Sequence, residues 1–134
     1  MPVPTTDAIL HDPDRVAAVR ATGLLDTRPE EAFDGLTKLA ARLLSVPSTF
    51  LSLVDEKRDF YKSCFGFSDP LATTRQVEGT TFCHFAIASD GPLVIGDTIA
   101  DPLYRDVPTV KSLGVRAYLG VPLINADGLA LGSF

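Results

Sequence analysis

Two strand-like segments joined by a short charged turn constrain this sequence more than any other feature. Residues 49–54 (TFLSLV) and 59–65 (DFYKSCF) are rich in β-forming residues and flank the turn Asp55-Glu56-Lys57-Arg58, which predicts an antiparallel hairpin. Apolar and polar residues alternate only weakly in these strands, so apolar side chains point to both faces of the sheet. Because such strands need cover on both faces, we expect an antiparallel sheet between two other layers.

Two helical segments precede the hairpin and can cover one face. Asp12 and Pro13 mark the start of a short helix. Thr27 and Glu30 have the spacing of a capping box, which predicts the start of a second helix. In this second helix apolar residues recur at three- and four-residue spacing and predict one core-facing side: Phe33, Leu36, Ala40, Leu43 and Leu44. We expect both helices to lie on the same face of the sheet.

The second half of the chain alternates short strands with irregular segments. A short helix is predicted from about residue 81, a strand at 93–95, a helical turn around 109–113, and a hairpin formed by 116–124 and 129–134. The largely irregular segment 66–114 must then cover the second face. The expected fold class is α+β, with helices on one face of the antiparallel sheet and a cover of loops and short helices over a pocket on the other.

Length and charge limit the possible functions. A chain of 134 residues is one domain in size, and a net charge of −5 disfavours a nucleic-acid-binding surface. The N-terminus does not resemble an export signal, and no apolar run is long enough to span a membrane. The two cysteines indicate thiols in a reducing compartment. We therefore expect a cytoplasmic protein with a tail at residues 1–11 and a domain at 12–134.

Three blocks of the sequence resemble one protein family. They are GLLDTRPEEAFDGLTKLAARLLSVPSTFLSLVDEKRDFYKSCFG, TTFCHFAIASDGPLVIGDTIADPLYRD and RAYLGVPLINADGLALGSF. In order and spacing they are similar to the opening, middle and closing blocks of a bacterial GAF domain, over about residues 15–134. The resemblance implies a PAS-like sheet with a ligand pocket. It also implies a place in a sensor histidine kinase, a diguanylate cyclase or a cyclic-dinucleotide phosphodiesterase.

The chain departs from that family at its C-terminal end. A typical member continues past the last strand into further strand residues and a C-terminal helix, whereas this sequence stops at Phe134. The resemblance therefore implies a domain truncated at its C-terminus. It also implies a surface, normally covered by that helix, that is exposed or covered by a partner chain.

The adjacent residues Cys83 and His84 are the most conspicuous candidate site. Successive helical residues point about 100° apart, so we expect only one of the two to face the core directly. A small buried thiol is the favoured interpretation of Cys83, with bilin attachment and a reactive nucleophile as alternatives. The complete set of candidate ligand contacts is Arg75, Phe82, Cys83, His84, Asp97, Tyr104 and Tyr118.

Other charged residues have simpler interpretations. Asp97 and Asp101 are expected to organise turns rather than to bind a cation. Three guanidinium groups match a carboxylate or phosphate of a ligand: Arg75, Arg105 and Arg116. A metal site would require four soft ligands without the usual short spacing to converge: His11, Cys64, Cys83 and His84. We therefore predict neither a metal site nor catalytic residues, and the cofactor stays unidentified.

Together these features predict a non-catalytic sensory or regulatory GAF domain. It would bind an unidentified small molecule, form a homodimer and control a signalling output carried by a longer parent chain. Two alternatives stay open: a pure dimerisation module without a ligand, and a bilin photoreceptor or thiol-dependent enzyme that uses Cys83. One GAF-fold enzyme family reduces free methionine sulfoxide with several cysteines, but Cys64 and Cys83 do not match its pattern.

Overall fold

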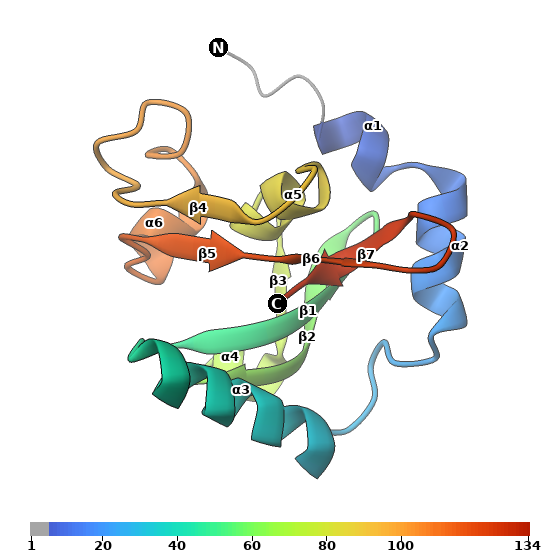
Figure 1. Ribbon diagram of the computed structural model, residues 1–134, viewed down its shortest axis with the longest axis horizontal. Coiled ribbons are helices and arrows are strands. Elements are labelled where there is room, and N and C mark those ends of the chain that lie inside the picture. Colours follow the sequence, from blue (N-terminus) through green and yellow to red (C-terminus); the bar gives the residue numbers. More distant parts are fainter. Residues whose placement is uncertain (1–5) are drawn as a thin grey trace.

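The computed structural model describes residues 6–134 and contains a central antiparallel sheet (Figure 1). Five strands are hydrogen-bonded in the order β3-β2-β1-β7-β6, and every neighbouring pair is antiparallel. The predicted hairpin is confirmed and forms β1 and β2. The five strands are β1 (Thr49–Val54), β2 (Arg58–Phe65), β3 (Gln76–Glu78), β6 (Pro122–Ile124) and β7 (Ala130–Ser133).

A two-stranded ladder extends this sheet on the β6 side. It consists of β4 (Leu93–Ile95) and β5 (Tyr118–Gly120), paired antiparallel. Only Val121 separates β5 from β6, and its backbone exchanges two hydrogen bonds with Phe134, of 2.8 and 2.9 Å. The chain from β5 to β6 is therefore one interrupted strand. Its pairing with β7 confirms the hairpin predicted at the end of the sequence.

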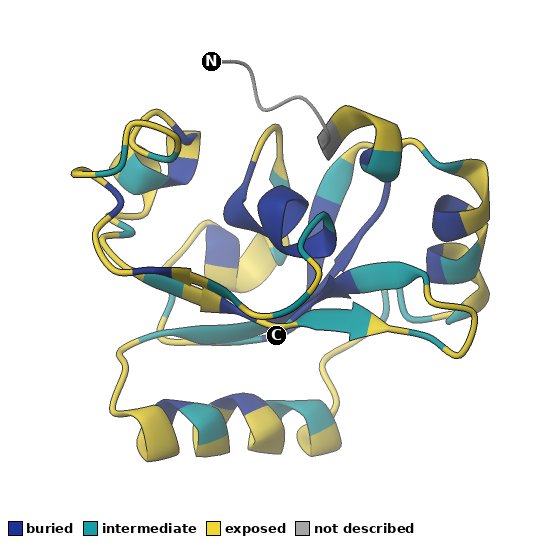
Figure 2. Ribbon diagram, turned by 45° about the horizontal axis from the view of Figure 1, so that its top comes forward, coloured by how far each residue is buried: buried dark blue, intermediate teal, exposed yellow. Residues whose placement is uncertain are grey.

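Helices cover both faces of the sheet, as the weak alternation in the strands predicted. Helix α3 (Glu31–Leu44) packs on β1 and β2 from one side, and α5 (Phe82–Ile87) lies on the other side (Figure 2). The α5 side also carries α4 (Leu71–Thr74) and α6 (Pro108–Ser112). This arrangement confirms the predicted α+β class. No helix among residues 6–134 has the length and apolar character needed to cross a membrane.

The first predicted helix is present, but its expected position was wrong. Helix α2 (Pro13–Ala21) starts after Asp12, whose carboxylate accepts a hydrogen bond from the backbone of Asp14 at 3.0 Å. It lies beside the β6–β7 hairpin instead of sharing a face with α3 (Figure 1). The buried guanidinium of Arg15 fixes it there, because it donates to the carbonyls of Val54 and Ala130 at 2.6 and 3.2 Å.

The segment expected to be a tail contains a further helix. Residues 1–5 lie outside the described part of the chain, but Thr6–Leu10 form α1. Leu10 is buried in a cluster with Val54, Cys83 and Ile87. A helix of five residues is too short to show a hydrophobic periodicity. The sequence therefore indicated no element here.

The capping box predicted at Thr27 is not formed. The N-cap of α3 is Glu30, and its side chain makes no capping hydrogen bond. The ammonium group of Lys62, which is completely buried, instead donates to the Thr27 hydroxyl at 2.6 Å and pairs with the Glu30 carboxylate at 2.6 Å. A buried cation needs such acceptors around it. Thr27 and Glu30 therefore bond Lys62 instead of capping the helix.

The apolar side predicted for α3 is only partly buried: Phe33 and Ala40 are half-buried, but the leucines are not. Leu36, Leu43 and Leu44 are exposed, whereas Thr37 and Ala41 are the buried residues of this helix. The Thr37 hydroxyl lies 2.8 Å from that of Ser63 on β2, which in turn donates to Asp34 at 2.6 Å. Small and polar side chains thus make the contact with the sheet, and the leucines point elsewhere.

Candidate functional site

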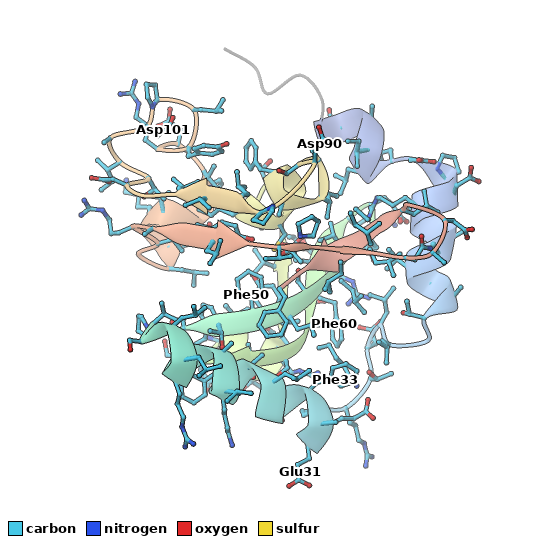
Figure 3. All side chains as sticks on the ribbon, in the orientation of Figure 1. Glu31, Phe33, Phe50, Phe60, Asp90 and Asp101 are labelled. Carbon is cyan, nitrogen blue, oxygen red and sulfur yellow. The ribbon has the colours of Figure 1, made fainter. Side chains whose placement is uncertain are left out.

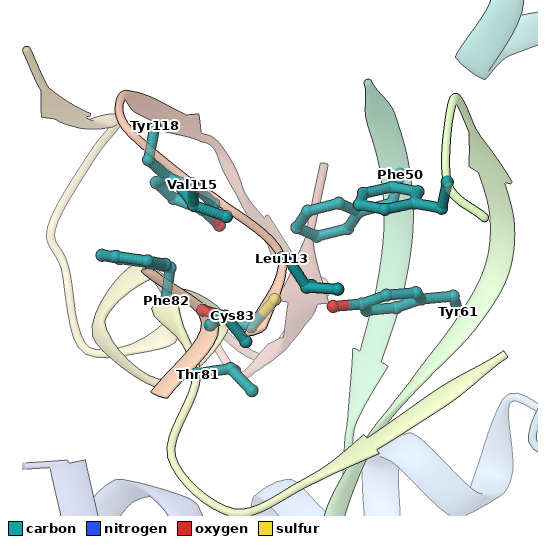
Figure 4. Close-up of a pocket in the computed structure, with 10 residues that line it drawn as sticks. Phe50, Tyr61, Thr81, Phe82, Cys83, Leu113, Val115 and Tyr118 are labelled. Atoms are coloured by element: carbon teal, nitrogen blue, oxygen red, sulfur yellow. The ribbon is translucent and has the colours of Figure 1, made fainter. Parts of the chain in front are cut away.

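A small cavity of about 30 Å³ lies between the sheet and the cover formed by α5 and α6 (Figure 4). Its walls come from β1, β2, β5 and both cover helices, together with the segment that links α6 to β5. The volume is enough for a water molecule and far too small for a metabolite. The lining residues are Phe50, Tyr61, Phe67, Thr81, Phe82, Cys83, Thr109, Leu113, Val115 and Tyr118.

Two pairs of stacked aromatic rings form opposite walls of this cavity. Phe50 and Tyr61 come from the sheet, and their ring centroids are 4.7 Å apart. Phe82 from α5 and Tyr118 from β5 are stacked at 5.1 Å, and Figure 4 shows them across the cavity from the first pair. Flat aromatic walls of this kind suit a planar or apolar ligand group.

One polar group at the cavity has no partner. Thr109 lies in α6, and its hydroxyl oxygen is buried without a hydrogen bond to any described residue. A buried hydroxyl in this state costs about 1–3 kcal/mol. By contrast, the Thr81 hydroxyl at the same cavity donates to the Asp59 carboxylate. Thr109 is therefore a lining residue whose hydrogen-bonding group the described residues leave unused.

Cys83 lines the cavity but is not a reactive thiol. Its side chain is buried, and the Ser52 hydroxyl donates to the sulfur at 3.4 Å. Burial, and next the nearby Asp59 carboxylate, raise the pKa of the Cys83 thiol far above its ordinary value. Because the thiolate is the nucleophile, this environment opposes both covalent attachment and thiol-based catalysis at neutral pH.

His84 is also buried, on a different side of α5. Its Nε2 lies 3.4 Å from Oδ1 of the fully buried Asp59, and neither atom has a hydrogen-bond partner among the described residues. Of the two residues only Cys83 belongs to a hydrophobic core cluster, although both side chains are buried. The cover surrounds α5 closely enough to enclose both side chains, and His84 does not line the cavity.

The two candidate tyrosines have different positions. Tyr118 lines the cavity, and its hydroxyl lies 3.4 Å from that of Ser133; burial raises the pKa of its phenol. Tyr104 lies behind the cavity wall, with its ring edge-on to Phe85 at 5.2 Å and tilted against Phe82 at 6.1 Å. Of the seven candidates, Phe82, Cys83 and Tyr118 line the cavity.

Arg75 holds backbone segments together and does not line the cavity. Its guanidinium donates to the carbonyl oxygens of Thr27 and Lys62, both at 2.8 Å, and to that of Tyr61 at 3.2 Å. These bonds join the segment before α3 to strand β2.

Asp97 organises an exposed turn. Its carboxylate accepts hydrogen bonds from the backbone of Ile99 at 3.0 Å and of Ala100 at 3.4 Å, and these bonds lower its pKa. Arg116 reaches the same carboxylate at 3.4 Å. Among residues 6–134 no three His, Cys, Asp or Glu side chains are grouped so that they could hold a metal ion.

Most of the cavity wall was missed by reasoning from the sequence. Phe50 and Tyr61 lie in strands that were predicted correctly. Which face of these strands lines the cavity depends on the segment that covers the sheet. Thr109 and Leu113 lie in the helical turn predicted around 109–113, within the segment expected to cover the second face, and Val115 follows that segment. The sequence predicted the cover but not which of its side chains face the cavity.

Comparison with known proteins agrees with the fold and the context expected from the sequence. The chain is 33% identical to a cyclic di-GMP phosphodiesterase of Pseudomonas aeruginosa over 120 residues, which is 89% of this chain. It spans 20%, about a fifth, of the length of that relative.

Solved structures of low sequence identity share the fold. A GAF domain from a phosphoenolpyruvate-protein phosphotransferase of Coxiella burnetii has a TM-score of 0.61 at 16% identity, covering 96% of this chain and 76% of that one. A free methionine-R-sulfoxide reductase from Neisseria meningitidis has a TM-score of 0.56 at 21% identity, covering 97% and 66%.

These comparisons contradict the expectation that this chain is not an enzyme. The fold is shared with free methionine-R-sulfoxide reductases, and the related protein of Pseudomonas aeruginosa is a phosphodiesterase. Enzymes can thus contain this architecture or use it directly. Fold class alone does not separate a sensor from a catalyst, and the label "non-catalytic" was wrong.

The most specific comparison is with models of protein families. The family model described as "GAF domain" matches residues 28–134, which include every strand and every residue that lines the cavity. This match agrees with the three sequence blocks and with the antiparallel sheet between helices. The chain therefore belongs to the GAF domain family.

Proposed function

We propose that this GAF domain is the ligand-sensing part of a protein that degrades cyclic di-GMP, and that it works in the cytoplasm. The reaction would be the one for which the relative is named, the cleavage of a phosphodiester bond of cyclic di-GMP. The domain would set the rate of that step in response to a small molecule. The unpaired state of both cysteines, Cys64 and Cys83, supports a reducing compartment.

One observation carries the sensing role: a cavity between two aromatic walls is lined by Thr109, whose buried hydroxyl has no partner among the described residues. A site that discriminates ligands combines apolar walls with a few polar groups that fix orientation. The rings of Phe50 and Tyr118 provide the walls, and Thr109 provides the polar group. An ordinary core would have filled the space or satisfied the hydroxyl.

The small size of the cavity gives the mechanism. At about 30 Å³ it holds no metabolite, so a ligand must bind a state in which the cover has moved away from the sheet. Helix α6 and Leu113 are the parts of the cover that continue directly into β5. A ligand that binds only the open state shifts the population toward it, and β5 carries that change into the sheet.

The test compares two buried threonines. Replacing Thr109 by Val removes the hydroxyl that has no partner, and we expect a free energy of unfolding higher by about 1 kcal/mol. Replacing Thr98 by Val is the matched control, because its buried hydroxyl donates to the Val115 carbonyl at 2.7 Å. That variant should be less stable by about 1 kcal/mol. Urea unfolding measures both.

The same variants test ligand binding. Protein purified from its own host is measured by native mass spectrometry, and we expect a small molecule on the wild type and on Thr98→Val, with less on Thr109→Val. Cyclic di-GMP in host cells that carry Thr109→Val should differ from the wild-type level. Equal occupancy in all three proteins, or an empty wild type with unchanged cyclic di-GMP, would contradict the proposal.

A further inference from the structure

Helix α6 lies between the cavity and a larger cleft on the outer side of the cover. Thr109 and Leu113, four residues apart, line the cavity. Pro108, Lys111 and Ser112 line the outer cleft, which has a volume of about 480 Å³. Their spacing of three and four residues places them together on another side of the helix. The two hollows are therefore distinct, and the outer one has the volume of a site for a small molecule.

The rest of this cleft comes from the turn that precedes α6. Arg105, Asp106 and Val107 belong to it, and Asp101, labelled in Figure 3, marks its beginning. Two backbone hydrogen bonds fix the turn: Arg105 donates to the Asp101 carbonyl at 3.0 Å, and Val107 donates to that of Tyr104 at 3.0 Å. Val107 is also buried in a hydrophobic core cluster. The charged side chains of the cleft therefore belong to backbone that is anchored in the core.

Two cations at the cleft are free to meet an anion. Among residues 6–134 neither Arg105 nor Lys111 takes part in an ion pair, whereas the exposed Arg116 reaches Asp97 at 3.4 Å. Both side chains at the cleft are exposed, so they can bind an anion without first breaking an ion pair. The chain as a whole has a net charge of −5, and an attraction for anions must therefore come from such a local group.

We propose that this cleft binds a small phosphate monoester that carries hydroxyl groups, as a sugar phosphate does. A phosphate monoester has a charge near −2 at neutral pH, which matches the guanidinium of Arg105 together with the ammonium of Lys111. The Ser112 hydroxyl is a further donor for the phosphate oxygens. The Asp106 carboxylate lines the same cleft and only accepts hydrogen bonds, so it suits the hydroxyl groups of the sugar and not the phosphate.

The apolar part of the lining favours a sugar phosphate over a nucleotide. It consists of Val107 and Pro108, and none of the six described residues that line the cleft is aromatic. A nucleobase binds best where a flat ring offers it a stacking surface. The carbon face of a sugar can instead lie on aliphatic side chains.

Isothermal titration calorimetry of the 134-residue chain with glucose 6-phosphate tests this site. The wild type should bind with a dissociation constant below about 1 mM, and added salt should weaken binding. Arg105→Gln and Lys111→Gln should each raise the dissociation constant by about 10-fold or more. Arg116→Gln is the matched control, because it removes an exposed cation that already pairs with Asp97. It should bind as the wild type does, and thermal melting establishes that all three variants are folded.

Three further ligands separate the contributions of phosphate and sugar. Glucose lacks the phosphate and should not bind. Inorganic phosphate should bind the wild type more weakly than glucose 6-phosphate does, and Asp106→Asn should reduce that difference, because it removes the carboxylate that accepts from the sugar hydroxyls. Guanosine 5′-monophosphate should bind no more tightly than glucose 6-phosphate. Binding of glucose alone, equal binding of inorganic phosphate or tighter binding of the nucleotide would each overturn the assignment to a sugar phosphate.

Nuclear magnetic resonance locates the ligand. The backbone amide signals of Arg105, Lys111 and Ser112 should shift when glucose 6-phosphate is added, while those of Phe50 and Tyr61 at the inner cavity should not. A wild type that does not bind, variants at Arg105 and Lys111 that bind equally well, or shifts confined to the cavity would overturn the site. None of these outcomes bears on the ligand of the cavity, which is measured separately on Thr109→Val.

Discussion

Several titratable side chains share one buried region around Cys83. Asp59 and Cys83 are almost without solvent contact, and Tyr61 and Tyr118 line the same cavity. Burial is the largest cause that raises the pKa of the Cys83 thiol and of both phenols. Burial therefore favours the neutral, protonated forms of the thiol and the two phenols. This preference makes the stability of the fold depend on pH in alkaline solution.

We predict that the free energy of unfolding falls as the pH rises above about 8.5. An unfolded cysteine ionises near that pH, while folded Cys83 keeps its proton, so the folded state binds more protons and loses stability. Each such group contributes about 1.4 kcal/mol per pH unit; below pH 8.5 its contribution is constant. Urea unfolding at several pH values should give a shallower decline for Cys83→Ala.

A matched variant separates titration from packing. Ser52→Ala removes the hydroxyl that donates to the Cys83 sulfur but keeps the thiol. It should shift stability by a similar amount at every pH and keep the wild-type slope. If Cys83→Ala and the wild type declined equally, the thiol would not be the group responsible.

Among the elements, the segment between α2 and α3 shows how a loop without secondary structure is fixed. Three cations from the β2–β3 region hold it. Lys62 bonds Thr27 and Glu30, and Arg75 bonds the Thr27 carbonyl. Arg58 forms a two-pronged pair with Asp26 at 2.6 and 2.8 Å. These contacts fix the segment that leads into α3.

We predict that Lys62→Met lowers the free energy of unfolding by about 2–3 kcal/mol. The change leaves the Thr27 hydroxyl and the Arg28 carbonyl without the donor that they share at 2.6 and 2.7 Å. Glu30→Gln is the matched variant. Glu30 is half exposed, so its loss of charge should cost less than about 1 kcal/mol. Equal losses in urea unfolding would mean that the ion pair, and not the buried ammonium, fixes the loop.

At the scale of the whole molecule, the pairing of β1 with β7 joins the two halves of the chain. Ser52 pairs with Ser133 and Leu53 with Gly132, and the Ser52 hydroxyl accepts a bond from the Ser133 backbone at 3.2 Å. Gly132 is required here by close approach: a Cβ at this position would overlap the Ser52 carbonyl. The pairing between the first hairpin and the last therefore requires glycine at position 132.

We predict that Gly132→Ala lowers the free energy of unfolding by about 3 kcal/mol or more, because the overlap involves backbone that cannot move without breaking the ladder. Gly96→Ala is the control, since nothing lies within 4 Å of a Cβ built there. It should change stability by less than about 0.5 kcal/mol. Thermal unfolding checks both variants, and a tolerated Gly132→Ala would show that the central pairing can shift.

Features that depend on neighbouring residues could be read from the sequence. The limits of β1 and β4 were predicted as observed, and the Asp12 cap, the α5 helix and the final hairpin were also correct. The GAF family followed from three blocks of residues. Of the cavity, Phe82, Cys83 and Tyr118 were anticipated. The predictions of elements use information within a few residues of chain, whereas the family rests on the order of three blocks along most of it.

Only the tertiary structure decided how the layers meet. The leucines of α3 have the periodicity of a core face, yet the sheet contacts Thr37 instead, whose hydroxyl lies 2.8 Å from that of Ser63 on β2. Thr109 became a site residue because α6 turns back over strands that lie more than forty residues earlier. Local sequence determined which segments are helices and strands. Long-range packing determined which side of each one is buried, because that choice depends on partners distant in the chain.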